Sequence, residues 1–350
     1  MQFRNIPNHE RLQFLLDEKE HLIADGATAT NLFELGLESG DPPELWNFDK
    51  PWLVIGNHEA MRHAGADILL TNSFGGNAYR MKLHGSQDRV FELNEEAALL
   101  ARQVVSEADR PMLVAGCMGP TGEIVMSTSG EAASIGTLTH EDAVEAFKYQ
   151  AISLQKGSAD IIWIETMSSL AEVDAAILGA RSTGLPIVCT MSFDTNGFTM
   201  MGLTPQDVAG YFTLDAIDVA AFGANCGGGF GDTVASIMEM HEVDQNETLV
   251  AKSNCGIPQL VKGRVCYSGT DNDVRKYARL SKDAGARIIG GCCGFTPEHI
   301  RILKEELERY TPFPVNLRLI DAELGLSRSD LTQPLKRRTS KSRASRRGIS

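Results

Sequence analysis

No long hydrophobic run occurs in this 350-residue chain, and no stretch approaches the ~18 uninterrupted apolar residues that a membrane-spanning helix needs. The N-terminal segment, Met1 to Glu20, carries charges throughout and lacks the apolar core of a secretory signal. Both absences predict a cytoplasmic protein that has no membrane as a partner. Hydrophobic residues make up 43% and charged residues 23%, so the chain can bury a sizeable core and is not a disordered protein.

Positive charge is scarce outside the last twenty residues. The formal net charge is −13, and residues 331–350 contain seven Lys or Arg and no Asp or Glu, which leaves −20 on residues 1–330. An acidic body of this size repels nucleic acid and anionic membrane surfaces, so neither is expected as a partner. The tail, residues 331–350, is rich in Ser and Thr and is predicted to be disordered. Binding of the tail to a polyanion or to the acidic body is the alternative.

Several functional motifs are also missing. The seven cysteines are an odd number in a chain without an export signal, which argues against a disulfide framework. The eight histidines form no H-x-x-x-H cluster, so a histidine zinc site is disfavoured. No G-x-G-x-x-G follows the first apolar run, as a dinucleotide-binding doubly wound sheet would require. No D-x-H-x-x-G segment indicates a cobalamin module.

Short apolar runs recur along the chain, and helical patterns separate them. Continuous apolar runs of this length are typical of parallel strands buried on both faces. The eight runs are 21–24, 66–70, 111–116, 161–164, 186–191, 219–224, 249–252 and 286–291. Helices are expected over 95–108, 140–156 after an N-cap at Thr139, 168–182 and 271–284.

Eight strand–helix units predict an α/β protein with a single (β/α)₈ TIM barrel. The barrel is expected to span residues 21–312, after an N-terminal extension (1–20) and before a C-terminal extension (313–330) and the basic tail. A homo-oligomer is compatible with this sequence, which does not decide the oligomeric state.

The carboxyl ends of the strands are where such a barrel keeps its active site. Two longer loops, 121–137 and 255–270, are expected at this end. Polar residues are common at the ends of strands, but several cysteines together at these positions are unusual. The residues at these ends are Asp25, Thr71, Asn72, Ser73, Cys117, Glu165, Ser192, Asn225, Cys226, Asn254, Cys292 and Cys293.

Two of these thiols, Cys292 and Cys293, are adjacent and lie between glycines. The pair could be two buried hydrophobes, a strained vicinal disulfide, or a metal or reactive-thiol site, and the last is favoured. Flanking glycines allow both sulfurs to face one point, and Cys226 follows the sixth run as a third thiol. Three cysteines with one open position are typical of catalytic zinc, which accepts a soft substrate thiolate. The pattern therefore favours alkylation of a small thiol.

Four segments together resemble the zinc-dependent homocysteine S-methyltransferases. They are Gly290–Gly294 (GGCCG), Gly223–Gly227 (GANCG), Ala24–Thr28 (ADGAT) and Leu70–Phe74 (LTNSF), and the resemblance runs from about Leu22 to Tyr310. It implies a (β/α)₈ barrel, one zinc ion held by Cys226, Cys292 and Cys293, and homocysteine as the methyl acceptor.

The resemblance also implies roles for the other strand-end residues. Asp25 and Gly26 match a motif that contacts the amino acid group of homocysteine, and Thr71 and Ser73 match the motif beside it. Glu165 matches the acidic active-site residue that receives the substrate ammonium, with a buried ion pair as the alternative. Asn225 precedes the first zinc thiolate, with a turn-forming side chain as the alternative.

The methyl donor is suggested by residues 276–300, which look most similar to short bacterial betaine–homocysteine S-methyltransferases. A trimethylammonium donor needs an aromatic cage, and Trp46 is the candidate for one wall, with plain packing as its alternative. The animal betaine enzymes carry tyrosines where this chain has Gly75 and Thr166, which keeps S-methylmethionine or another sulfonium as the alternative donor. A non-enzymatic barrel that stores zinc or senses redox state is the remaining alternative.

Overall fold

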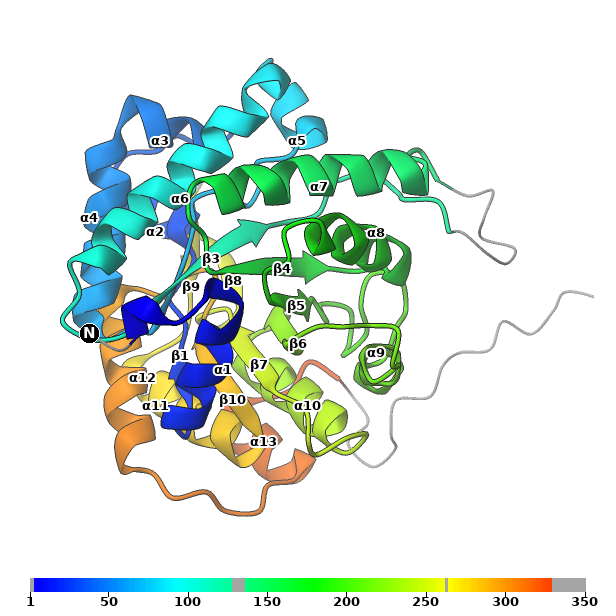
Figure 1. Ribbon diagram of the computed structural model, residues 1–350. Helices are drawn as coiled ribbons and strands as arrows, with labels where there is room; N and C mark the ends of the chain where they lie inside the picture. The colour runs from blue at the N-terminus through cyan, green and yellow to red at the C-terminus, as the bar shows by residue number, and fades with distance from the viewer. Residues whose placement is uncertain (1–2, 128–135, 262–263, 329–350) are drawn as a thin grey trace, which may run out of the picture.

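Eight parallel strands form the barrel at the centre of the structure (Figure 1). The computed structural model describes residues 3–127, 136–261 and 264–328. Around the barrel the order is β1-β10-β7-β6-β5-β4-β3-β2, and a parallel bridge between Ala24 and Ile68 joins its two ends. The strands are β1 (Leu22–Ile23), β2 (Ile68–Leu70), β3 (Leu113–Met118), β4 (Ile161–Met167), β5 (Ile187–Met191), β6 (Ala221–Cys226), β7 (Leu249–Ser253) and β10 (Ala286–Gly291). The predicted TIM barrel is thereby confirmed.

Helices surround this barrel in the expected alternation. Thr139 caps α7, and its side chain accepts a hydrogen bond from the Asp142 N–H, as the sequence predicted. The helix expected from residue 95 begins earlier, at Val90. The helices are α2 (Thr28–Glu34), α3 (Trp46–Asp49), α4 (Pro51–Ala64), α5 (Ala78–Lys82), α6 (Val90–Ser106), α7 (His140–Lys156), α8 (Leu170–Arg181), α9 (Pro205–Phe212), α10 (Phe230–His241), α11 (Asp271–Asp283) and α12 (Pro297–Arg309). Within the described parts of the chain, none is long and apolar enough to cross a membrane.

The N-terminal helix α1 (Asn8–Glu18) lies across the barrel end in Figure 1. Its buried leucines, Leu12, Leu15 and Leu16, join one apolar cluster with inward-facing strand residues. Arg11 on α1 and Arg102 on α6 both pair with the buried carboxylate of Asp160, just before β4. The predicted extension is therefore packed into the barrel core, at the end opposite the strand carboxyl ends.

Two other segments hold more structure than the sequence indicated. The expected loop 255–270 contains an antiparallel hairpin, β8 (Pro258–Val261) and β9 (Arg264–Tyr267). The expected C-terminal extension contains α13 (Leu317–Leu324), which packs against α10 and α11, and Arg328 forms a buried ion pair with Glu239. Part of the loop 121–137 and the tail 331–350 lie outside the described residues, so the prediction for the tail stays a prediction.

One buried histidine on α4 gives the fold a defined response to acid. His58 is fully buried, neither ring nitrogen has a partner among the described residues, and burial lowers its pKa to about 4. Between pH 6.5 and 4 the unfolded chain binds a proton that the folded chain does not. As the pH is lowered across this window, the free energy of unfolding should therefore decrease, by roughly 3 kcal/mol in total.

Replacing the imidazole by a hydrocarbon should flatten this response. In urea unfolding at pH 7 and pH 4.5, His58→Leu is expected to lose less stability on acidification than the native chain. His63→Leu, at an exposed position of the same helix, is the control and should keep the native response. Equal acid sensitivity of the native protein and His58→Leu would contradict the assignment.

Candidate metal and substrate site

Three cysteine sulfurs converge at the carboxyl end of the barrel. Cys226 ends β6, Cys292 and Cys293 follow β10, and the three sulfur atoms all lie within 4.8 Å of one another. Cys226 has a left-handed backbone, with φ of 62°, and Gly294 follows the pair with φ of 80°. A side chain at residue 291 would meet the Phe295 ring at 2.0 Å, so glycine is required there. These turns explain how adjacent cysteines, which alternate in a strand, face one point.

The chemistry of these donors fits one soft divalent ion. Hydrogen bonds from Cys292 and Cys293 lower the pKa of the Cys226 thiol, which favours its thiolate form. Zinc–sulfur bonds of about 2.3 Å in a tetrahedron place sulfurs about 3.8 Å apart, a small contraction of the observed cluster. The end of β7 holds the turn, since the Cys292 N–H donates to the Ser253 backbone carbonyl and the Cys293 N–H donates to the Asn254 side-chain oxygen Oδ1.

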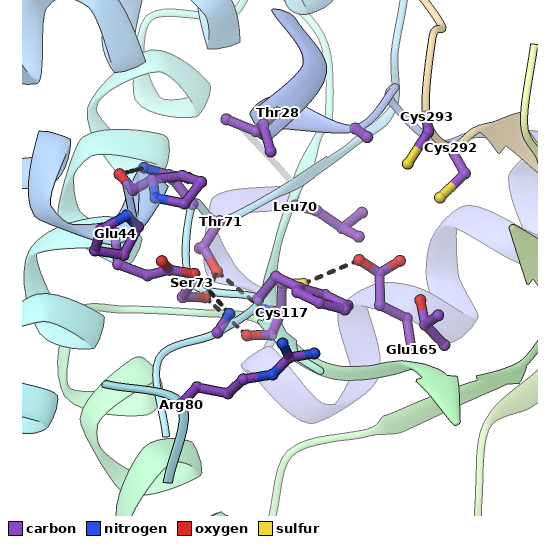
Figure 2. Close-up of a pocket in the computed structure, with 18 of the residues that line it drawn as sticks. Thr28, Glu44, Leu70, Thr71, Ser73, Arg80, Cys117, Glu165, Cys292 and Cys293 are labelled. Carbon is purple, nitrogen blue, oxygen red and sulfur yellow. Dashed lines mark hydrogen bonds between the residues drawn. The ribbon is translucent and has the colours of Figure 1, made fainter. Parts of the chain in front are cut away.

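A cavity of about 350 Å³ opens beside the thiols (Figure 2). The three cysteines, Glu165 and Lys252 line one part of it. Figure 2 shows Glu44 and Arg80 at another part of the lining, with Thr71, Ser73 and Cys117 between. Phe74 also lines the cavity, and its ring centroid lies 5.9 Å from the Arg80 guanidinium. This volume suits an amino acid together with a small second substrate.

Glu165 lines this cavity and keeps one carboxylate oxygen without a hydrogen-bond partner in the described structure. Its Oε1 accepts a hydrogen bond from the Cys117 thiol at 3.2 Å, whereas its buried Oε2 has no partner among the described residues. Burial raises the pKa of Glu165, and the positive charge of Lys252 opposes that rise. A buried carboxylate oxygen without a partner is costly, and a substrate ammonium would satisfy it.

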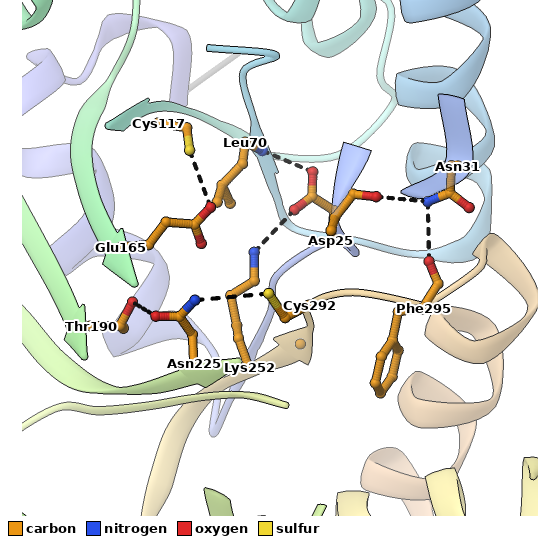
Figure 3. Close-up of polar contacts among 12 residues, drawn as sticks. Asp25, Asn31, Leu70, Cys117, Glu165, Thr190, Asn225, Lys252, Cys292 and Phe295 are labelled. Carbon is orange, nitrogen blue, oxygen red and sulfur yellow. Dashed lines mark hydrogen bonds and ion pairs between the residues drawn. The ribbon is translucent and has the colours of Figure 1, made fainter. Parts of the chain in front are cut away.

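Asp25 lies beneath the cavity and does not line it. Its Oδ2 accepts the Leu70 N–H at 2.8 Å, and its Oδ1 lies 3.5 Å from the Lys252 ammonium (Figure 3). The expected direct contact between Asp25 and the substrate is therefore not supported, because strand β2 and Lys252 occupy this carboxylate. Gly26, the next residue, does line the cavity, where a side chain would meet the Phe295 carbonyl at 2.7 Å.

Thr71 and Ser73 fix the loops around the cavity. Their hydroxyls lie 2.6 Å apart, Ser73 donates to the Cys117 carbonyl, and Thr71 accepts the Cys117 N–H. Both residues line the cavity, as predicted for the substrate motif, but these hydroxyls also tie the end of β2 to β3.

Asn225 braces two unusual turns. Its Oδ1 accepts hydrogen bonds from the Thr166 N–H and the Thr190 hydroxyl, and its Nδ2 donates to the Thr166 hydroxyl. Thr166 has φ of 63°, close to that of Cys226, and Asn225 Nδ2 lies 3.8 Å from the Cys292 sulfur. Asn225 therefore positions the thiol cluster and, in this structure, does not line the cavity.

Trp46 is absent from the described lining of the cavity. It is 6% exposed and packs with other apolar side chains, and the Lys50 ammonium lies 4.1 Å from its ring centroid. Its apolar neighbours are Leu32, Leu37, Val54 and Leu100. The structure thus places Trp46 in apolar packing, and its role as a donor wall stays a prediction. Phe74 is an aromatic residue that the described lining of the cavity does include.

Sequence reasoning missed four charged lining residues: Asp41, Glu44, Arg80 and Lys252. Lys252 carried a usable signal, because a lysine within a strand run predicted to be buried on both faces needs a partner. Glu44 and Arg80 come from loop and short-helix segments whose direction no periodicity fixes.

Comparison with known proteins places these features in one family. Residues 22–307 match the model of the homocysteine S-methyltransferase family. The fold superposes on the homocysteine methyltransferase MmuM from Escherichia coli, with a TM-score of 0.66 for its oxidized form at 25% identity, covering 84% of this chain and 98% of that one. The metallated form of MmuM gives a TM-score of 0.67 at 24% identity, covering 84% of this chain and 99% of that one.

Among curated proteins, methionine synthases of Mycobacterium leprae and Mycobacterium tuberculosis are 26% and 28% identical over 296 residues. These matches cover 80% of this chain and 24% of each synthase, so the chain spans about a quarter of the length of these relatives. With the family model matching most of its length, this chain belongs to the homocysteine S-methyltransferase family.

Proposed function

We propose that this protein transfers a methyl group to the thiol of homocysteine, with one zinc ion held by Cys226, Cys292 and Cys293. The observation that carries the proposal is the convergence of three thiols within 4.8 Å, at a cavity where Glu165 offers an unpartnered carboxylate oxygen. Family membership supports homocysteine as the acceptor.

Bound zinc would lower the pKa of the acceptor thiol and keep its sulfur nucleophilic at neutral pH. The chain's own residues would bind and orient the substrate. Glu165 accepts the acceptor's ammonium, and the Cys117 thiol fixes the rotamer of that carboxylate by donating to Oε1.

An onium compound is the donor that we propose, with glycine betaine first and S-methylmethionine second. The acidic body attracts a cation or zwitterion more than an anionic folate. Phe74 offers an aromatic face within the cavity, and Gly119 leaves room for its ring, since a Cβ there would lie 2.6 Å from it.

The test is methionine formation by zinc-loaded protein from homocysteine and each donor in turn. Turnover with betaine or a sulfonium is expected. Turnover with methyltetrahydrofolate alone would overturn the donor class. Tight zinc binding without turnover on any of these donors would support the storage or sensing alternative.

The Phe74 ring gives a separate prediction about donor binding. Phe74→Ala should raise the donor KM about 5- to 30-fold, because a desolvated cation gains about 1–2 kcal/mol on an aromatic face. The homocysteine KM should change little. Phe48→Ala removes an exposed ring outside the described lining of the cavity and is the matched control. An unchanged donor KM in Phe74→Ala would remove Phe74 from the donor site.

A further inference from the structure

We propose that Lys252 is the carboxylate anchor of the cavity: its ammonium binds the carboxylate of the amino-acid acceptor while Glu165 binds the ammonium of the same molecule. This inference rests on the proposed function and deepens it, since it names the chain's own partner for the second charge of the substrate.

The Lys252 ammonium has unused hydrogen-bonding capacity. Lys252 is 1% exposed and lies on β7, where it lines the cavity. An ammonium has three donor protons, yet within the described chain its one hydrogen-bond partner is Asp25 Oδ1, at the long distance of 3.5 Å. A buried charge with open donors is costly, so the site is suited to a further anionic acceptor.

Asp25 is badly placed to be the full partner of this lysine. Its other oxygen accepts the Leu70 N–H at 2.8 Å, which holds the carboxylate against β2. The Trp163 ring lies on another side of the ammonium, with its centroid 5.3 Å away. Neither neighbour gives the ammonium a second hydrogen-bond acceptor.

Glu165 and Lys252 are charges of opposite sign that do not touch. Figure 3 shows the Lys252 ammonium between the carboxylates of Asp25 and Glu165. No ion pair within 4.0 Å joins Lys252 to Glu165 in the described structure, whereas Lys252 does pair with Asp25 at 3.5 Å. A carboxylate and an ammonium held apart at one cavity wall are complementary to a zwitterion.

The position of this pair favours the acceptor over the donor. Figure 3 shows both residues near Cys292, one of the thiols that would hold the acceptor sulfur. Arg80, whose guanidinium lies 5.9 Å from the Phe74 ring centroid, is at another part of the lining in Figure 2. An α-amino acid with a two-carbon arm to its thiol carries both charges a short distance from its sulfur. A carboxylate on the donor, as in betaine, is the second source of the same chemistry.

The experiment compares homocysteine with 3-aminopropane-1-thiol, which has the same thiol and amine but no carboxylate. Binding to zinc-loaded protein is measured by calorimetry, and KM and kcat are measured with the donor found active. In Lys252→Met, the Kd and KM for homocysteine should rise about 10- to 100-fold, as for a lost charged hydrogen bond. The values for 3-aminopropane-1-thiol should not change.

Two further variants guard against damage to the fold. Asp25→Asn/Lys252→Met removes both charges together, so no carboxylate is left buried without its cation, and it should show the same selective loss. Lys252→Arg keeps the charge and should restore part of the homocysteine affinity. Lys282→Met, at a buried lysine on α11 that pairs with Glu20, is the matched control and should bind both thiols normally.

A second set of measurements compares two methyl donors: betaine, which has a carboxylate, and trimethylsulfonium, which has none. A rise in the betaine KM alone, with homocysteine unaffected, would assign the anchored carboxylate to the donor. Equal losses for homocysteine and 3-aminopropane-1-thiol, or no loss for any carboxylate, would overturn the proposal. Native protein that neither binds nor methylates homocysteine would instead refute the proposed function, which the calorimetry separates from failure of the anchor.

Discussion

Alanine at Cys226, Cys292 or Cys293 is expected to remove most of the bound zinc and nearly all methyl transfer. Each sulfur supplies one of three protein ligands, and the loss of one leaves a two-thiol set that holds zinc far more weakly. The barrel should survive, because its core is built from the strands and α1 and not from a metal at the rim. Metal analysis after dialysis and thermal unfolding of each variant are the measurements.

The remaining thiols provide the controls for this experiment. Cys266→Ala changes an exposed position on the hairpin, and Cys189→Ala changes a buried core position on β5. The first should be indistinguishable from the native protein. The second should lose stability but keep its zinc. Full zinc retention in Cys226→Ala would show that the ligand set is wrong, whatever happens to activity.

The barrel could be predicted from the sequence because each strand is buried on both faces. Such strands leave continuous apolar runs, and all eight runs became barrel strands with small shifts in their ends. The three thiols could be predicted for a related reason. They directly end or follow strands, so the position of the strand fixes the position of the sulfur.

Residues placed by long-range packing could not be predicted in this way. Trp46 lies in a segment after β1 whose direction depends on α2, α4 and α6, and those elements bury it. Asp25 meets Lys252 across 227 residues of chain, so its strand-end position alone did not show that its carboxylate is occupied. The burial of α1 in the barrel end likewise depends on three leucines that give no tertiary signal by themselves.

Glu165→Gln separates substrate orientation from proton transfer. We expect the homocysteine KM to rise roughly 10- to 150-fold, since a charged hydrogen bond lost in a buried site is worth about 1.5–3 kcal/mol. Zinc content should stay at one per chain, because Glu165 lies outside the thiol cluster. The kcat at saturating homocysteine should change much less than KM, because bound zinc would already have lowered the pKa of the acceptor thiol.

The matched control for this variant is Glu172→Gln. Glu172 is another buried carboxylate, and it accepts hydrogen bonds from the Thr121 N–H and hydroxyl outside the described lining of the cavity. Its replacement should cost stability and leave the homocysteine KM unchanged. If Glu165 were instead a general base, Glu165→Gln would lower kcat steeply at an unchanged KM, and the loss would diminish as pH rises and the free thiol ionises. An ammonium receptor loses affinity without that recovery, so the pH profile of the variant decides between the two roles.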